Sequence, residues 1–455
     1  MTHIKNNSLS RREFIKRIGM GTASAAIMVG MGPLVSIGKD DDQPTLVNGM
    51  TYRVNRKTGD KVSLLGFGMM RLPFKDGDID QDLVNKEVSH ALKHGVNYFD
   101  TSPHYVNDKS ESSLGIALKA SGVSRKDYYI ATKLSNFGQR EWSREESEKL
   151  YRRSFEHLQT DYIDYYLLHS IGQGGMESLN GRFIDNGMLD FLLEERKAGR
   201  IRNLGFSYHG DVRVFDYLLA NNDKYKWDFV QIEMNYVDWK HADEVNKRNT
   251  KAEYLYTQLE NHDIQAVIME PLFGGRLAKL PDVYARQLKQ LRPDDSLASW
   301  AFRFCGTYPN VLTSLSGMTY MEHLEDNLKT HSPLDPCSKS ELALLEDIAT
   351  NLATYPIIPC TDCKYCMPCP YGVNIPGNFA FYNACVNDGT LPPTDPNANG
   401  FKKKNAKFQK AYKKALPESQ LASQCVECGE CLKKCPQRIP IPTRMGRLTD
   451  LLDRK

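Results

Sequence analysis

Short apolar runs alternate with longer amphipathic stretches through the middle of the chain, from Ser63 to Gly317. Eight of the runs are strand-like, at residues 63–70, 96–102, 127–134, 163–170, 201–210, 228–236, 264–272 and 310–317. The stretches between them, such as 83–95 and 143–159, repeat apolar residues every three or four positions, which predicts helices. This alternation predicts parallel strands joined by right-handed crossovers. Eight repeats in about 260 residues favour a closed (β/α)8 TIM barrel over the alternative, an open doubly wound sheet.

The first forty residues follow a different pattern. A polar, basic start precedes an uncharged run, rich in Gly and Ala, from Ile18 to Ile37. The segment SRREFIK, with Arg11 and Arg12 adjacent, resembles a twin-arginine export signal. We expect residues 1–38 to be such a signal, which the twin-arginine translocase recognises. The protein would then be periplasmic, or membrane-associated if the signal is not cleaved. The alternative is a membrane anchor that happens to carry two arginines.

Composition narrows the classes of protein to consider. Hydrophobic residues make up 41% and charged residues 25%, which are globular values and exclude a fibrous or largely disordered chain. The net charge of +3 argues against nucleic acid as a partner. A chain of 455 residues suggests two or three domains. We place a barrel at residues 48–334 and a C-terminal domain at 338–455.

Four polar residues lie where catalytic groups are expected in such a barrel, at or just beyond the carboxyl ends of the strands. Asp100, Lys133 and His169 end the second, third and fourth predicted strands, and Tyr105 follows in the loop after Asp100. An ammonium beside a Tyr hydroxyl favours tyrosinate and lowers its pKa, a carboxylate holds the ammonium, and a His orients a carbonyl oxygen. Singly, each residue has an ordinary structural explanation, such as a helix cap, a solvated strand end or a core histidine.

Residues 50–332 resemble an aldo-keto reductase. The resemblance is carried by GVNYFDTSPHYVNDKSESSLG (95–115) and then, in order, by IATKL, YYLLHS, GFSYHG, VQIEMNY, EPLFGGRL and SGMTYMEHLEDNL. It implies an enzyme that interconverts a carbonyl and an alcohol by hydride transfer. In that enzyme Tyr105 is the general acid, Lys133 and Asp100 adjust its pKa, and His169 orients the carbonyl.

The same resemblance implies a nicotinamide dinucleotide, NAD or NADP. The matching cofactor-binding positions are Met70, Ser207, Gln231, Met269, Pro271, Leu272, Gly317 and Asn327. Ser207 and Gln231 match positions that hold the carboxamide, and Asn327 matches one that contacts the adenine end.

Three departures from the family pattern bear on this cofactor. Tyr208 replaces an Asn, and Met269 replaces the aromatic residue that stacks on the nicotinamide. Gly317 and His323 stand where many members carry a Lys and an Arg for the 2′-phosphate of NADP. Because such a phosphate needs cationic partners, the sequence does not predict a preference for NADP.

Two cysteine strings, CTDCKYCMPCP (360–370) and CVECGECLKKCP (425–436), dominate the C-terminal domain. The second is the bacterial ferredoxin pattern, in which three thiolates bind one 4Fe-4S cluster and the fourth reaches another. By that analogy the strings predict two clusters in a small, mainly helical ferredoxin-like domain. Cys360, Cys363, Cys366 and Cys435 would bind one cluster, and Cys425, Cys428, Cys431 and Cys369 the other. Structural zinc and disulfides are the weaker alternatives.

The remaining features of this domain have simpler explanations. Cys305, Cys337 and Cys385 fit buried or linker thiols. The segment FKKKNAKFQKAYKKA (401–415) carries seven Lys and predicts a solvated helix, with a docking patch for an acidic redox partner as the alternative.

Together these patterns indicate an exported oxidoreductase that acts on a small-molecule carbonyl or alcohol. Hydride transfer moves two electrons and each cluster moves one, so two clusters could link the barrel to a one-electron redox partner. The alternative is an iron–sulfur electron-transfer subunit whose barrel is a non-catalytic scaffold.

Overall fold

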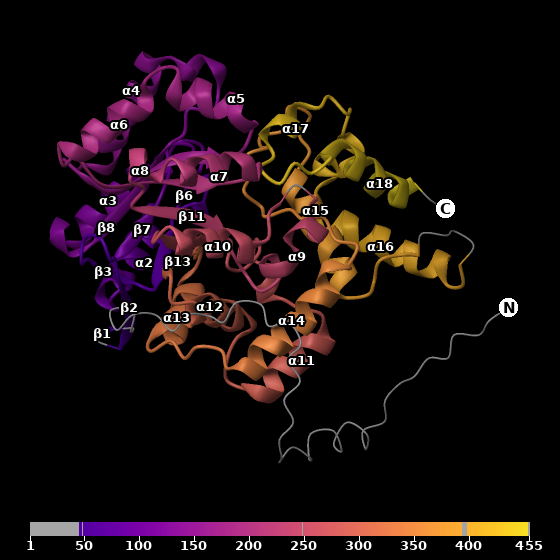
Figure 1. Ribbon diagram of the computed structural model, residues 1–455. Helices are drawn as coiled ribbons and strands as arrows, with labels where there is room; N and C mark the ends of the chain where they lie inside the picture. The colour runs from indigo at the N-terminus through magenta and orange to yellow at the C-terminus, as the bar shows by residue number, and fades with distance from the viewer. Residues whose placement is uncertain (1–44, 48, 248, 394–397, 454–455) are drawn as a thin grey trace, which may run out of the picture. The chain divides into compact units, whose positions relative to one another are not determined.

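The computed structural model describes residues 45–47, 49–247, 249–393 and 398–453. Within these ranges a closed barrel comes first, and a cysteine-rich helical segment, coloured orange to yellow in Figure 1, follows it in the same compact unit. The predicted export signal at 1–38 lies outside the described residues. In the part of the chain that is described, no helix combines the length and apolar character needed to cross a membrane.

Eight parallel strands form the barrel, and their order around it follows the chain until β13 pairs with β4 to close the ring. They are β4 (Leu65–Gly68), β7 (Tyr98–Asp100), β8 (Tyr129–Leu134), β9 (Ile163–Ile171), β10 (Ile201–Tyr208), β11 (Phe229–Glu233), β12 (Gln265–Met269) and β13 (Val311–Ser316). Seven strands lie inside their predicted apolar runs, and β9 extends one residue beyond its run. The predicted (β/α)8 fold is therefore confirmed.

Helices follow the strands around the barrel, and amphipathic ones bury an apolar face. Helix α4 is typical: the Ser143 side chain caps its first turn, and Leu150, Tyr151 and Leu158 are buried at helical spacing. The helices of this part are α2 (Gln81–Lys93), α3 (Ser110–Ser121), α4 (Arg144–Leu158), α5 (Gly175–Leu179), α6 (Met188–Lys197), α7 (Val212–Ala220), α8 (Asn222–Tyr225), α9 (Asp238–Val245), α10 (Ala252–Asn261), α11 (Asp282–Leu291), α12 (Leu297–Thr307) and α13 (Met321–His331). Single turns occur at η2 (Arg125–Asp127), η3 (Gln139–Trp142), η4 (Asn180–Ile184) and η5 (Arg276–Ala278).

A small antiparallel sheet precedes the barrel, formed by β1 (Thr45–Val47), β2 (Met50–Val54) and β3 (Lys61–Ser63). Val62 of β3 packs in the same cluster as the interior side chains Tyr98, Tyr165 and Phe229. This sheet therefore packs at the end of the barrel where the strands begin. The opposite end, where the strands finish, is left for the site. A short hairpin, β5 (Phe74–Lys75) and β6 (Asp78–Ile79), follows β4.

Helix α14 (Lys339–Ala353) lies within the C-terminal domain predicted at 338–455 and packs on the barrel. Leu345, Ile348 and Leu352 on its buried face belong to the core of the barrel. The apolar face of α14 is thus covered by the barrel, and the cysteine-rich segment begins after this helix.

The cysteine-rich segment contains four further helices: α15 (Ile375–Asn387), α16 (Phe401–Ala415), α17 (Glu430–Lys434), which lies within the second string, and α18 (Ile441–Asp453). The described residues of this segment contain no strand but two more single turns, η6 (Glu418–Gln420) and η7 (Ala422–Gln424). Phe379, Phe408 and Tyr412 are central members of a separate core here. All seven Lys of α16 are exposed and its aromatic residues are buried.

Candidate functional site

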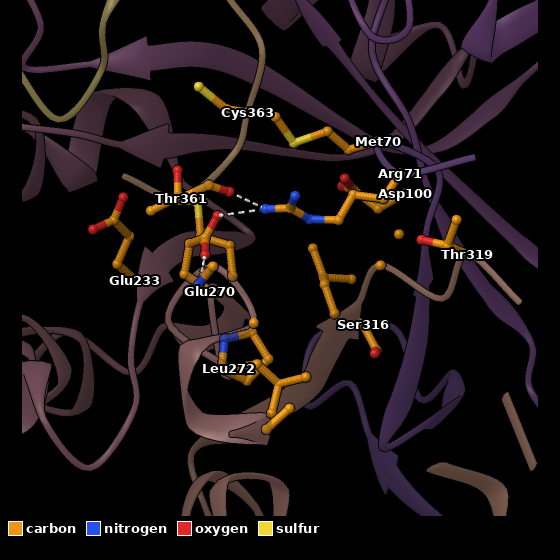
Figure 2. A pocket seen from close by; sticks show the side chains of 18 of the residues that line it. Met70, Arg71, Asp100, Glu233, Glu270, Leu272, Ser316, Thr319, Thr361 and Cys363 are labelled. Atoms are coloured by element: carbon orange, nitrogen blue, oxygen red, sulfur yellow. Dashed lines mark hydrogen bonds and ion pairs between the residues drawn. The ribbon is translucent and has the colours of Figure 1, made fainter. Parts of the chain in front are cut away.

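A cavity of about 520 Å³ lies at the carboxyl end of the barrel (Figure 2). Six strands contribute to its wall. Five contribute their last residues, Gly68, Asp100, Glu233, Met269 and Ser316, and β9 contributes His169, two residues before its end. Because parallel strands all finish at this face, enzymes with this fold place their active sites here. The volume is in the range of small-molecule sites.

The wall of the cavity contains a buried ion pair. Lys133 Nζ donates to Asp100 Oδ1 at 2.6 Å and to the Thr101 carbonyl at 2.8 Å. The side chains of Lys133 and Asp100 are 1% and 3% exposed. Asp100 lines the cavity and Lys133 lies behind it. The Asp100 carboxylate therefore holds the Lys133 ammonium behind the residues that line the cavity.

Tyr105 and His169 face the cavity together. Their rings meet edge to face with centroids 6.0 Å apart, and Lys133 Nζ lies 5.0 Å from the centre of the Tyr105 ring. His169 Nδ1 is 2.6 Å from Ser135 Oγ, and Arg182 donates to the His169 carbonyl at 2.7 Å. The structure thus brings all four predicted catalytic residues to one barrel mouth.

Burial dominates the ionisation of these groups. It raises the pKa of Asp100 and lowers the pKa of Lys133, while their ion pair opposes both shifts. It also raises the pKa of Tyr105 well above the usual value, and Tyr365 and Asp100 add to this increase. The sequence predicted that Lys133 would lower this pKa, but burial raises it. Burial, followed by Lys133, lowers the pKa of His169 well below its usual range. At neutral pH Tyr105 is therefore a hydroxyl and His169 a neutral ring.

Seven of the eight predicted dinucleotide contacts line the same cavity: Met70, Gln231, Met269, Pro271, Leu272, Gly317 and Asn327. Ser207 is the exception, because its buried Oγ accepts a hydrogen bond from the Ser170 backbone N–H at 2.9 Å. Gln231 Oε1 is buried and has no hydrogen-bond partner among the described residues. A carboxamide placed beside it would satisfy this oxygen, so the residues present fit a nicotinamide group.

Charge along the cavity bears on the choice of dinucleotide. Glu322 and Asp326 line the cavity beside His323 and Asn327. Arg71 supplies the single Arg or Lys side chain among the described lining residues. Carboxylates without a free cation make this region unfavourable for a 2′-phosphate.

The eight predicted cluster ligands form two groups. Cys360, Cys363, Cys366 and Cys435 line one small cavity, and Cys369, Cys425, Cys428 and Cys431 line a second. Cys366 borders both cavities, so the two groups adjoin. The fourth thiol of each string thus lies with the first three thiols of the other string.

The arrangement of these thiols suits a bulky group. No three His, Cys, Asp or Glu side chains in the described ranges converge as a single metal ion would require. Four thiols spread around a cavity instead fit a 4Fe-4S cubane. All eleven cysteines are unpaired, and the three outside the strings, Cys305, Cys337 and Cys385, are buried.

Several residues of the site were not found by sequence reasoning. Four of them come from the cysteine-rich segment and line the catalytic cavity: Thr361, Tyr365, Pro436 and Gln437. Cys363, predicted as a cluster ligand, lines this cavity as well. No local pattern marks a contact between segments so far apart in the chain. Arg71 was also missed, although it follows the first predicted strand directly and the rule that catalytic groups follow strand ends would have found it.

Comparison with known sequences gives two family matches. Residues 64–349 match the aldo/keto reductase family, and residues 359–439 match a 4Fe-4S dicluster domain. An L-galactose dehydrogenase from Arabidopsis thaliana is 39% identical over 151 residues, which cover 33% of this chain and 46% of the plant protein. An aldo-keto reductase from Mycolicibacterium paratuberculosis is 28% identical over 269 residues, 59% of this chain and 80% of that protein.

Two solved structures each cover about two thirds of this chain. An aldo-keto reductase from Bacillus halodurans aligns with a TM-score of 0.52 and 23% identity, over 66% of this chain and 96% of that one. An aldo/keto reductase from Klebsiella pneumoniae, solved with NADP and acetate, gives a TM-score of 0.51 and 20% identity. The alignment covers 65% of this chain and 94% of that one. At these identities the likeness establishes the fold.

Proposed function

This chain belongs to the aldo/keto reductase family and carries a 4Fe-4S dicluster domain, and on this premise we propose that it is an exported oxidoreductase. The proposed reaction interconverts a small carbonyl compound and its alcohol, with Tyr105 transferring the proton. Two 4Fe-4S clusters exchange the electrons with a separate one-electron partner.

The position of Cys363 is the observation that carries this proposal. Cys363 lines the catalytic cavity together with Tyr105, and it also lines the small cavity that it shares with Cys360, Cys366 and Cys435. A cluster held by these thiols would border the site where the substrate reacts. This supports electron exchange over a purely structural role for the cluster.

The polar residues of the cavity divide the proton chemistry between them. Tyr105, held as a hydroxyl by burial, donates its proton to the oxygen of a carbonyl substrate and recovers it in the reverse direction. When Ser135 donates to Nδ1 of His169, the other ring nitrogen carries the proton and can orient the same oxygen. Asp100 and Lys133 place a charged pair behind Tyr105.

The remaining cavity is proposed to hold a nicotinamide dinucleotide, which supplies or accepts the hydride when bound. Gln231 would accept from the carboxamide, and Met269 would lie against the nicotinamide ring. Asn327 would contact the adenine end. The carboxylates of Glu322 and Asp326 favour a dinucleotide without a 2′-phosphate.

The cysteine groups are proposed to carry the electrons. An alcohol that becomes a carbonyl loses two electrons and two protons, and two one-electron clusters have the capacity to take both electrons. Cys428 of the second group is exposed. The second group is therefore the place where an external one-electron carrier would reach the protein.

Export is proposed from the sequence alone. Arg11 and Arg12 precede a mildly apolar run, and the twin-arginine route carries folded proteins. Clusters that are assembled inside the cell would then cross the membrane already bound to the folded protein.

Tyr105→Phe tests the proposal. The substitution removes the proton donor and leaves the cysteines untouched, so we expect turnover to fall by about 10²- to 10⁴-fold. Turnover is measured anaerobically with a panel of small aldehydes, ketones and alcohols, NAD or NADH, and ferricyanide as the one-electron acceptor for oxidation. In the wild-type protein the reactive alcohol should bleach the visible absorbance of the clusters, and in Tyr105→Phe it should not.

The matched control is Tyr128→Phe, a buried Tyr outside the cavity, which should retain both turnover and bleaching. Wild-type turnover in Tyr105→Phe would rule out Tyr105 as the proton donor. Turnover without bleaching would leave the clusters a structural role. A wild-type protein that turns over none of the panel would favour an electron-transfer subunit with a scaffold barrel.

A further inference from the structure

The first cysteine string brings a tyrosine to the catalytic cavity. Tyr365 lies between Cys363 and Cys366, two predicted ligands of the first cluster, and it lines the cavity together with Tyr105 and His169. The Tyr365 side chain is half-buried, and its hydroxyl makes no hydrogen bond to any described residue. A tyrosine hydroxyl both donates and accepts hydrogen bonds, so this group is available to a molecule that fills the cavity.

Aromatic contacts fix the direction of the Tyr365 ring. It meets the Phe137 ring at 60° with centroids 6.3 Å apart, and the centroid of Phe137 lies 4.9 Å from that of His169. The Arg182 guanidinium, which donates to the His169 carbonyl, lies 5.1 Å from the centre of the Phe137 ring. Phe137 therefore joins Tyr365 to His169, the residue proposed to orient the carbonyl.

Tyr365 and Tyr105 are also coupled electrostatically. Burial is the largest cause of the raised pKa of Tyr105, and Tyr365 comes next, ahead of Asp100. Because electrostatic interactions weaken with distance, this order indicates that the two hydroxyls lie close together. The cavity thus presents two neighbouring tyrosine hydroxyls, one from the barrel and one from the cysteine string.

The two hydroxyls have different partners in the proposed reaction. A carbonyl oxygen has two lone pairs, and in the proposed function it accepts hydrogen bonds from Tyr105 and from His169. A third donor at Tyr365 finds no lone pair left on that oxygen. Its partner is then a second polar atom of the substrate, near the carbonyl because the two hydroxyls are near each other.

We propose that Tyr365 is a substrate-binding residue that donates a hydrogen bond to a second oxygen of the substrate, on the carbon next to the reacting carbonyl. The preferred substrates are then α-hydroxy carbonyl compounds and, in the reverse direction, vicinal diols. This inference deepens the proposed function and rests on it for the position of the reacting oxygen. A substrate without the second oxygen would take the place of water at Tyr365 and leave the hydroxyl unpaired, which costs binding free energy.

The place of Tyr365 between two cluster ligands strengthens this role. A cluster held by Cys363 and Cys366 would fix the backbone on both sides of Tyr365, so the ring would be in position before the substrate binds. A side chain that is already ordered loses little freedom on binding, which favours affinity and selectivity. The segment that is proposed to carry electrons would therefore also select the substrate.

Paired substrates that differ by one hydroxyl group test this role. Glycolaldehyde is compared with acetaldehyde, and hydroxyacetone with acetone, in anaerobic assays with NADH. Tyr365→Phe removes the hydroxyl but keeps the ring and its contact with Phe137. We expect kcat/KM to fall about tenfold for the hydroxylated member of each pair, and to change by less than about twofold for the other member. Iron content and visible absorbance confirm that the variant retains its clusters.

The matched control is Tyr371→Phe. Tyr371 belongs to the same cysteine-rich segment, is 49% exposed and lies outside the catalytic cavity. Its substitution should leave the ratio of kcat/KM values within each pair unchanged. Tyr105→Phe should instead lower the turnover of all four compounds, because it removes the proton donor.

Binding is measured separately, by saturation-transfer NMR with hydroxyacetone and with acetone on the oxidised holoprotein. The Kd of hydroxyacetone should rise about tenfold in Tyr365→Phe, and the Kd of acetone should not. Equal losses for both members of a pair, or no loss for either, would overturn the role of Tyr365, and an inactive Tyr105→Phe would show that the proposed function still stands. A wild-type protein that turns over none of the four compounds would overturn the proposed function, and the Kd values would then decide the role of Tyr365 alone.

Discussion

Asp100 and Lys133 are buried so deeply that each charge depends on the other. Removing one partner of such a pair typically costs about 3–5 kcal/mol, because the remaining charge stays buried without compensation. Substitutions at either residue would therefore disturb the fold and the chemistry together. Tyr105 is the cleaner probe of catalysis, since no hydrogen bond among the described residues joins its hydroxyl to this pair.

Glu87 on α2 is a buried carboxyl group without a partner. Its side chain is fully buried, and neither carboxyl oxygen has a hydrogen-bond partner among the described residues. Burial, with small contributions from Asp80 and Glu322, raises its pKa from 4.5 to about 7. Below 4.5 the group is protonated in both the folded and unfolded states. Between 4.5 and 7 the unfolded chain loses the proton first, so the free energy of unfolding falls as pH rises through this window.

We therefore expect Glu87→Gln to raise the free energy of unfolding at pH 8 by as much as about 3 kcal/mol, and to have little effect at pH 4. Thermal unfolding of the barrel at several pH values measures the difference. Glu156→Gln, which neutralises an exposed carboxylate on α4, is the control and should show no such pH dependence. A Glu87→Gln effect that is the same at pH 4 and pH 8 would contradict the proposed ionisation.

Local sequence patterns predict some residues of the site, and the others are placed there by long-range contacts. Asp100, Lys133 and His169 were predicted because parallel strands bring their carboxyl ends together, whatever the loops do. Tyr365 and Gln437 were not, because their place at the cavity depends on how the cysteine-rich segment packs on the barrel. The sign of the Tyr105 pKa shift was wrong for a related reason, since the depth of burial is a property of the packed structure.

At the scale of elements, the apolar runs predicted the strands because side chains buried on both faces of a parallel strand leave an almost continuous hydrophobic segment. All nine residues of β9 are buried in this way. The contact of helix α14 with the barrel was not predicted, because an amphipathic pattern shows that a face is buried but not which partner covers it.

The fourth thiol of each cysteine string lies with the first three thiols of the other string, and this arrangement can be tested. Cys435→Ala should empty the group next to the catalytic cavity, and Cys369→Ala should empty the second group. Each variant should retain about half of the iron of the wild type, about four atoms from eight. The two should differ in function: substrate bleaching should be lost in Cys435→Ala, whose cluster borders the cavity, and should persist in Cys369→Ala.

Cys385→Ala is the matched control, since Cys385 is a buried thiol in the same core but lines neither small cavity. It should keep all of the iron. Equal loss of bleaching in Cys435→Ala and Cys369→Ala would contradict the division into a group beside the cavity and a second group beyond it.

At the scale of the whole molecule, the structure places the catalytic cavity and the two thiol groups in a continuous series of neighbouring sites. The catalytic cavity shares Cys363 with the first thiol group, the first group shares Cys366 with the second, and Cys428 of the second group is exposed. In the proposed function, electrons would pass from the substrate through the first and second thiol groups to the protein surface. The proposed electron path requires the cysteine-rich segment to be folded on the barrel, because Cys363 and Cys366 link the cavity and the two thiol groups.

That requirement connects the fold to the proposed export route. Clusters are assembled inside the cell, and a route that carries unfolded chains would deliver the protein without them. Replacing Arg11 and Arg12 together by Lys keeps the charge but removes the pair that the twin-arginine translocase recognises. We expect this variant to accumulate inside the cell with its clusters in place, as measured by cell fractionation and by iron content. Lys16→Arg should export normally. If the double variant still reaches the outer face of the membrane, residues 1–38 act as an ordinary anchor whose charge alone matters.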